Sequence, residues 1–326
     1  MALTLTLAEQ ILSGDRRALA KAITLVESTR ADHGDQAVAL LEALMSHTGQ
    51  SIRIGVSGAP GVGKSTFIES LGNYLTEQGH RVAVLAVDPT SAVSGGSILG
   101  DKTRMETLSV NPKAFVRPSP AGKTLGGVTR RTRESLLLCE AAGYDVIIVE
   151  TVGVGQSETA VSDMTDMFLL LLSPGGGDDL QGIKRGIMEL ADLVLVNKAD
   201  GDQANLASQT VSDYRAALHF MQARTPSWTP QVEACSALNN TNIETAWSVV
   251  TEFRQALVAS GELTALRAQQ ARAWMWAETA EMLIAGLKNH PTIKSMVPEL
   301  EQQVLAGTLP AIVAAERLIE HYKASE

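Results

Sequence analysis

A glycine-rich segment near residue 60 has the residue types and spacing of a loop that wraps phosphate groups. It reads Gly58, Ala59, Pro60, Gly61, Val62, Gly63, Lys64, Ser65 and Thr66. Residues 58–65 match G-x-x-x-x-G-K-[ST], in which glycines let backbone N–H groups turn toward phosphate oxygens and the next helix adds its positive end. Lys64 is expected to reach the β- and γ-phosphates, and Ser65 to ligate Mg²⁺. A glycine-rich turn without a ligand is the alternative, but the apolar run before the loop and the helical pattern after it favour phosphate binding.

A second candidate site, Asn197-Lys198-Ala199-Asp200, follows the apolar run 192–196. In a doubly wound sheet this position lies at the carboxyl edge of the strands, where ligands bind. The four residues resemble the guanine-reading NKxD motif of GTPases. The carboxylate of Asp200 can accept two hydrogen bonds from guanine, from N1–H and the exocyclic amino group, whereas adenine offers no such pair. Asn and Asp are also common in turns and caps, but after a phosphate loop this motif favours guanine.

A third element, Ser236-Ala237-Leu238, comes directly after the last apolar run before the C-terminal helical region. It resembles the segment whose backbone contacts guanine in the same enzymes. An ordinary strand-to-helix turn is nearly as good an interpretation. Both readings stay open at the level of the sequence.

Three acidic residues are candidates for the Mg²⁺ region. Glu150 follows the apolar run 144–149 and opens the segment ETVGVGQ. A carboxylate there can hold a water of the metal, and the N–H of Gly153 can reach a γ-phosphate. Most P-loop GTPases carry Asp at the start of this element, so Glu150 differs from the residue usually found at this position. Asp88 and Asp101 are further candidates near Mg²⁺ or the attacking water, with a turn or helix cap as the alternative for each.

Two further glycine-rich loops, 91–104 and 173–185, are expected at the same sheet edge as the phosphate loop. Their high entropy cost of ordering suits a switch that the nucleotide orders, although a plain flexible loop is the alternative. Several basic side chains in or near these elements can neutralise transition-state charge, but none is marked as an arginine finger, so slow intrinsic hydrolysis is expected. These residues are Lys102, Arg104, Arg130, Arg131, Arg133, Lys184 and Arg185.

The elements that must position these residues follow from the alternation of apolar runs and helical stretches. The runs are IRIGVSG, RVAVLAVD, YDVIIVE, MFLLLLS, DLVLVNK and QVEACSA. Runs that are apolar at consecutive positions indicate strands covered on both faces, and strands alternating with helices predict a doubly wound, mostly parallel α/β sheet of the P-loop NTPase type. Because a helix over 64–78 separates the first two runs, the second strand is expected to be parallel to the first.

Helical patterns flank this central region on both sides. Leucine and alanine recur every three or four residues before the sheet, and strand patterns stop after it. We therefore predict an N-terminal helical segment over 1–50, a P-loop GTPase domain over 51–260 and a C-terminal helical extension over 261–326. In that extension Trp274, Met275, Trp276, Met282 and Leu283 surround much of one helix, which needs burial either on its own core or in a dimer interface.

Composition excludes several classes of protein. The chain has 326 residues, 45% hydrophobic and 19% charged, which is ordinary for a globular protein. A net charge of −9 argues against a nucleic-acid partner. The two cysteines lie far apart with no CxxC spacing, which suits a reducing compartment. The first residues lack the basic region and long apolar run of a signal peptide, and no stretch reaches the length of a membrane span, so neither is expected. A cytoplasmic location without a membrane partner is expected.

Six segments in order resemble the MeaB/ArgK branch of P-loop GTPases: GAPGVGKST, VLAVDPTS, LGDKTRM, ETVGVGQSE, SPGGGDDLQGIK and NKAD. The resemblance covers nearly the whole chain, and Glu150 matches the glutamate that opens the third nucleotide-binding element in this family. It implies a SIMIBI-type G domain, with GTP, GDP and Mg²⁺ as ligands. It also implies that Ser65, Asp88, Asp101 and Glu150 surround Mg²⁺, and that Gln181 and Lys184 belong to a third switch loop.

The same resemblance implies a homodimeric GTPase chaperone of adenosylcobalamin-dependent methylmalonyl-CoA mutase, with the C-terminal helices building the dimer. Such a chaperone gates cofactor loading and protects the mutase from inactivation. Two rival functions stay open. A nickel-insertion GTPase needs clustered His or Cys ligands, whereas the six histidines here are scattered. A small-molecule P-loop kinase needs an acceptor pocket and has no reason to keep a guanine-reading motif.

Overall fold

The computed structural model describes residues 2–28, 30–87, 105–118, 125–151, 157–175, 185–221 and 224–325. The chain forms two compact units, Met1–Arg267 and Ala268–Glu326. The first unit contains an α/β sheet with its covering helices, and the second is helical. In the part of the chain that the structure describes, no helix is both long and apolar enough to cross a membrane.

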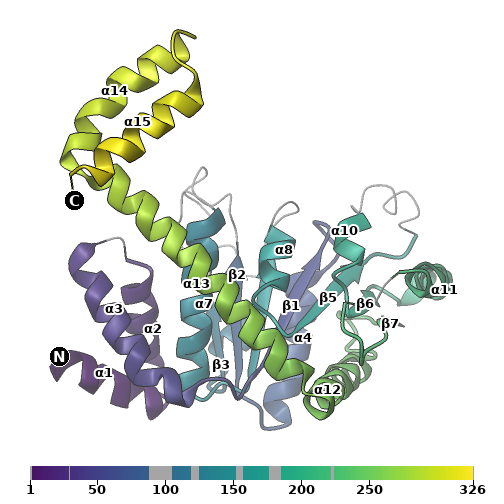
Figure 1. The fold of residues 1–326 in the computed structure, drawn as a ribbon. Helices are drawn as coiled ribbons and strands as arrows, with labels where there is room; N and C mark the ends of the chain where they lie inside the picture. Colours follow the sequence, from purple (N-terminus) through teal and green to yellow (C-terminus); the bar gives the residue numbers. More distant parts are fainter. Residues whose placement is uncertain are drawn as a thin grey trace. The chain divides into compact units, whose positions relative to one another are not determined.

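Within the described residues, seven parallel strands form one sheet in the order β3-β2-β4-β1-β5-β6-β7 (Figure 1). Their bounds are β1 (Ile52–Gly58), β2 (Val82–Val87), β3 (Ala114–Arg117), β4 (Val146–Thr151), β5 (Met167–Leu172), β6 (Leu193–Val196) and β7 (Gln231–Ala234). The central strands are buried along their whole length, as expected for a parallel sheet covered on both faces. The predicted doubly wound parallel fold is confirmed.

One strand was not predicted from the sequence. β3 has only four residues, two of them half-exposed, and among the described strands it pairs with β2 alone. An edge strand this short carries too few apolar residues to show a period. The second predicted strand is parallel to the first, as expected, but β4 lies between them.

Helices cover both faces of the sheet. α4 (Lys64–Glu77) and α12 (Ile243–Ser260) pack together over one face, where Phe67, Leu71 and Phe253 join the main core. α7 (Leu125–Ala141) and α8 (Ser157–Ser162) pack on the strands from the other face. This division follows from right-handed crossovers, because the chain moves in opposite directions along the sheet after β1 and after β4.

The other helices of the first unit lie around this sandwich. The N-terminal helices pack on one another and on α7 (Figure 1). Their bounds are α1 (Ala2–Leu12), α2 (Arg16–Val26), α3 (Ala31–Leu44) and the short η1 (Met45–His47). Three short helices lie in connections between strands: α6 (Glu106–Val110), α10 (Arg185–Met188) and η2 (Gly201–Gln203). The longer α11 (Ala204–His219) follows η2 and leads into β7.

The second unit is built from helices. α13 (Glu262–Asn289) begins in the first unit and continues into the second, where α14 (Pro291–Leu305) and α15 (Ala311–Lys323) follow. α14 and α15 pack against each other, and Ile293, Leu300 and Ala314 are buried. This unit buries few apolar side chains and leaves many exposed.

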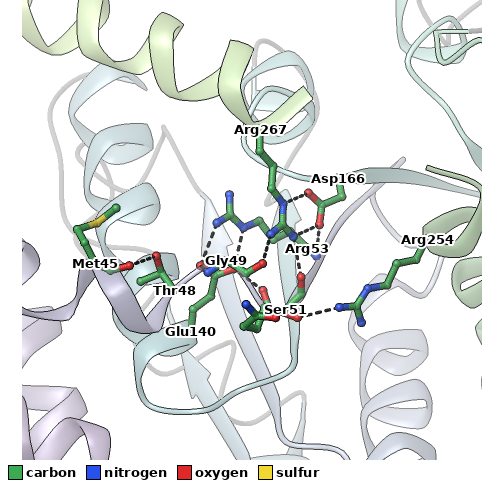
Figure 2. A network of polar contacts seen from close by, with 10 residues as sticks. Met45, Thr48, Gly49, Ser51, Arg53, Glu140, Asp166, Arg254 and Arg267 are labelled. Carbon is green, nitrogen blue, oxygen red and sulfur yellow. Dashed lines mark hydrogen bonds and ion pairs between the residues drawn. The ribbon is translucent and has the colours of Figure 1, made fainter. Parts of the chain in front are cut away.

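A buried ion pair lies at the amino edge of the sheet, at the opposite end of β1 from the phosphate loop (Figure 2). Arg53 donates from Nε and Nη2 to the two carboxylate oxygens of Glu140 on α7, at 3.0 and 2.9 Å. The Ser51 hydroxyl and the Gly49 N–H donate to the same carboxylate, at 2.5 and 2.9 Å. Both oxygens of Glu140 are therefore satisfied, as a buried charge requires.

Arg267 at the start of α13 extends this network within the first unit (Figure 2). Its Nε and Nη2 donate to both carboxylate oxygens of Asp166, at 2.8 and 2.7 Å. Its Nη1 donates to the carbonyl of Gly49 and its Nη2 to that of Ser51. Asp166 also accepts the backbone N–H of Arg53 at 2.8 Å. The network joins β1, the residue directly before β5, α7 and the first turns of α13.

Candidate functional site

The phosphate loop leaves the carboxyl end of β1 and enters α4 at Lys64. Its glycines adopt backbone conformations that side chains disfavour, with φ of 79° at Gly61 and 96° at Gly63. A Cβ on Gly58 would lie 2.5 Å from the Leu171 carbonyl oxygen, and one on Gly63 would lie 2.6 Å from Nδ2 of Asn197. Glycine at these positions lets the loop pass close to its neighbours and opens a ring of backbone N–H groups at the helix N-terminus.

The lysine of the loop folds back over the backbone. Nζ of Lys64 donates to the carbonyl of Gly58 at 2.7 Å and to that of Ala59 at 3.3 Å. These bonds hold an ammonium group at the mouth of the loop, where phosphate oxygens would replace the carbonyls as partners. The geometry suits the expected contact with the β- and γ-phosphates.

Two of the expected Mg²⁺ residues meet at this loop. The hydroxyl of Ser65 donates to Oε1 of Glu150 at 3.3 Å, although the two residues are 85 positions apart in sequence. Glu150 lies on β4, is only 5% exposed and pairs with Val56 of β1 and Ala86 of β2. A hydroxyl and a carboxylate are the hard oxygen donors that Mg²⁺ prefers. The donor set therefore fits a magnesium ion between α4 and β4.

The remaining acidic and switch candidates lie outside the described residues. These are Asp88, Asp101, Gln181 and Lys184. β2 ends at Val87, which pairs with Thr151 directly after Glu150. The chain position of Asp88 therefore follows a strand end that neighbours Glu150.

A cavity of about 500 Å³ lies beside the phosphate loop. It is lined by Gly63, Thr66, Asn197, Lys198, Asp200, Gly201, Asp202, Gln203, Ala237 and Leu238. Three segments that are separate in sequence thus meet in one hollow. Gly201, Asp202 and Gln203 were not among the predicted residues, and the only signal for them was their position directly after the NKAD motif.

Asn197 holds these segments together. Its Nδ2 donates to the carbonyl of Val62 at 2.9 Å, and its Oδ1 accepts the backbone N–H of Ala237 at 3.0 Å. Lys198, at a φ of 60°, donates from Nζ to the carbonyl of Gly61 at 2.7 Å. The first two residues of the motif therefore have an architectural role, because they fix the phosphate loop relative to the base cavity.

Asp200 faces the cavity from the end of the motif. One of its carboxylate oxygens, Oδ2, accepts a hydrogen bond from the Ser236 hydroxyl, which orients the carboxylate. A carboxylate fixed in this way can accept the paired N–H donors of guanine. Ser236 is fully buried, whereas Leu238 is exposed at the lip of the cavity. The structure thus brings the third candidate element to the base cavity.

We expect Asp200→Asn to weaken the preference for GTP over ATP at least about tenfold, because the amide cannot accept both guanine donors. The same amide can donate to the 2-carbonyl of xanthine, so affinity for XTP should rise. Dissociation constants for the three nucleotides measure this. Asp213→Asn, an exposed aspartate on α11, is the matched control. An unaltered GTP preference in Asp200→Asn would count against the role of Asp200.

Comparison with known proteins agrees with this geometry. The sequence model of the family described as "Methylmalonyl Co-A mutase-associated GTPase MeaB" matches residues 19–292. A crystal structure of "LAO/AO transport system kinase" is 38% identical and superposes with a TM-score of 0.77, covering 99% of this chain and 98% of that one.

Relatives that this chain covers over most of their length carry related names. A "Putative GTPase" of Caulobacter vibrioides is 55% identical over 96% of both chains. The "GTPase ArgK" of Escherichia coli is 50% identical over 86% of this chain and 85% of its own. The "Methylmalonic aciduria type A homolog, mitochondrial" of Mus musculus is 49% identical over 96% of this chain and 78% of its own. The chain is therefore a GTP-hydrolysing P-loop enzyme that belongs to the MeaB family of methylmalonyl-CoA mutase-associated GTPases.

Proposed function

We propose that this GTPase is a nucleotide switch that binds adenosylcobalamin-dependent methylmalonyl-CoA mutase, gates loading of its cofactor and protects it from inactivation. The observation that carries the proposal is the family match, which spans the phosphate loop, Glu150 and the guanine motif in one stretch. The name of the mouse relative, a methylmalonic aciduria type A homolog, supports the same partner.

In the proposed mechanism the chain supplies positioning and charge for phosphoryl transfer. Ser65 and Glu150, with Asp88 and Asp101, would hold Mg²⁺, which neutralises negative charge on the β- and γ-phosphates. Backbone N–H groups of the loop and Lys64 stabilise the oxygens that gain charge as water attacks the γ-phosphorus. The bond to the β–γ bridging oxygen breaks, and GDP and phosphate are released.

The switch itself is proposed to lie in the loops around the γ-phosphate. With GTP bound, segments 88–104, 153–157 and 174–184 would adopt one arrangement, and hydrolysis would release it. Gln181 and Lys184 are proposed to sense the partner. Intrinsic hydrolysis is expected to be slow and to be stimulated by the mutase, because no arginine finger is evident in the sequence.

We also propose that the C-terminal extension over 261–326 forms a homodimer. α13 exposes large apolar side chains, with Trp276 64% exposed and Met282 64% exposed, and Leu283 and Ile284 are exposed next to them. Several large apolar side chains exposed on one helix are typical of an interface. A second copy of the helix would cover it.

The test uses purified full-length chain and purified mutase. The chain is loaded with GDP or with a non-hydrolysable GTP analogue, and complex formation is followed by light scattering after gel filtration. We expect the amount of complex to differ between the two nucleotide states and the mutase to raise the rate of GTP hydrolysis. No complex in either state, with hydrolysis unchanged by the mutase, would exclude this partner.

A further inference from the structure

A groove of about 1050 Å³ lies next to the cavity beside the phosphate loop that Asp200 faces. That cavity is called the guanine cavity below. Its floor is one face of α4, and its walls are α6 on one side and the loop from β7 into α12 on the other. Thr66, Ala237 and Leu238 line both the groove and the guanine cavity. The groove and the cavity therefore share one wall segment.

Hydrogen bonds from α4 hold both walls in place. Oε1 of Glu69 accepts the backbone N–H and the hydroxyl of Thr107 on α6, at 2.8 and 2.7 Å. Nδ2 of Asn73 donates to the same hydroxyl at 2.7 Å. On the other side the hydroxyl of Ser70 donates to the Ala237 carbonyl at 2.6 Å. The groove is thus a built feature, with walls tied to one helix.

The lining combines negative charge with exposed aliphatic side chains. The charged residues that line it are all glutamates, and no Lys, Arg or His from the described part of the chain is among them. These residues are Glu69, Glu77, Glu106 and Glu244. Val110 on the α6 wall is 77% exposed and Leu238 on the opposite wall is 78% exposed. Exposed aliphatic groups on both walls leave apolar surface that water covers poorly.

We propose that this groove docks a cationic amphipathic segment of a partner protein. An apolar side chain of that segment packs between Val110 and Leu238, and its Lys or Arg heads lie against the glutamates. A small inorganic cation would leave both aliphatic side chains in water, and an acidic peptide or nucleic acid would be repelled by the glutamates. Charge and apolar surface together therefore select this class of occupant. The inference rests on the groove and holds whichever partner carries the segment.

The probe is a fluorescein-labelled amphipathic peptide of Leu, Ala and Lys, compared with the same peptide carrying Glu in place of Lys. Binding to the full-length, GDP-loaded chain is followed by fluorescence anisotropy. We expect the Lys peptide to bind at least about tenfold more tightly than the Glu peptide. Glu77→Lys with Glu106→Lys should weaken it at least about tenfold, and the neutral change Val110→Ser should also weaken it, because the apolar contact is lost.

A matched control separates the groove from general attraction to an acidic protein. Glu42→Lys with Glu252→Lys makes the same change in net charge at exposed positions outside the groove lining. It should leave peptide binding unchanged. GDP affinity and unfolding midpoints of all variants verify that the fold is kept.

Two results would overturn the inference. One is equal weakening by the control pair and the groove pair, which would show that only net charge matters. The other is a changed oligomeric mass of the free protein in Val110→Ser, which would show that a second copy covers the groove. Because the mutase takes no part in this test, either result leaves the proposed function standing.

Discussion

Lys64→Ala is expected to reduce GTP hydrolysis by about 10²- to 10³-fold, the loss typical when one preorganised donor to a transition-state oxygen is removed. Nζ of Lys64 lies at the mouth of the phosphate loop, 2.7 Å from the Gly58 carbonyl. When nucleotide binds, it would donate its hydrogen bonds to phosphate oxygens in place of this carbonyl. Alanine leaves the backbone N–H groups in place but removes the only charge that this loop contributes. The rate of phosphate release at saturating GTP and Mg²⁺ measures the effect.

A second lysine provides the control. Nζ of Lys113 also donates to a backbone carbonyl, that of Thr76 at 3.0 Å, but it lies outside the guanine cavity and the phosphate loop. Lys113→Ala should hydrolyse GTP at the wild-type rate. If Lys64→Ala also keeps the wild-type rate while its unfolding midpoint is unchanged, Lys64 does not stabilise the transition state.

Glu140→Ala is expected to reduce the free energy of unfolding by about 3–5 kcal/mol, because it leaves the Arg53 guanidinium buried without its carboxylate. The side chains of this pair are only 6% and 1% exposed. The same carboxylate accepts hydrogen bonds from Ser51 and Gly49, so removal also leaves a buried hydroxyl and a backbone N–H without a partner. Urea unfolding followed by circular dichroism measures the change.

Asp32→Ala is the matched control for this change. Asp32 accepts paired hydrogen bonds from Nε and Nη2 of Arg30, the same bidentate arrangement, but the two side chains are 68% and 57% exposed. Water screens such a pair, so the variant should unfold close to the wild-type urea concentration. Equal loss of stability in both variants would show that burial is not the reason for the effect.

The pH dependence of the Glu140 contribution has a definite sign. Burial on its own would raise the pKa of Glu140, but the hydrogen bonds and charge of Arg53, with Ser51 and Gly49, outweigh burial and hold the pKa below its usual range. A carboxylate with a lowered pKa in the folded state stabilises the fold above its unfolded pKa, and that stabilisation is lost as the pH falls through the folded pKa. The difference in stability between wild type and Glu140→Ala should therefore shrink in acid.

The sequence was most informative where a motif coincides with a turn. The phosphate loop and the NKAD motif each follow a buried strand, so their place at the carboxyl edge of the sheet follows from the parallel fold. Their local chemistry depends on neighbouring residues in the sequence. For that reason residue order alone was enough to predict the fold and to bring the base and phosphate elements to one edge.

Contacts between distant residues that belong to no motif were beyond prediction from a single sequence. Arg53 and Glu140 are 87 positions apart, and Arg267 and Asp166 are 101 apart; nothing in their local sequence identifies them as partners. β3 was missed because a four-residue edge strand shows no period. The linking role of Asn197 was missed for a different reason, because the motif suggests base recognition and gives no sign of the bonds to Val62 and Ala237.

The central claim is that one edge of the sheet holds a guanine nucleoside triphosphate, with the phosphates on the loop 58–65 and the base against Asp200. Isothermal titration calorimetry of the purified, folded chain tests it most directly. We expect clear saturable heat with Mg-GTP and with Mg-GDP, and much weaker binding of Mg-ATP. Saturable heat with Mg-ATP and none with Mg-GTP would contradict the claim.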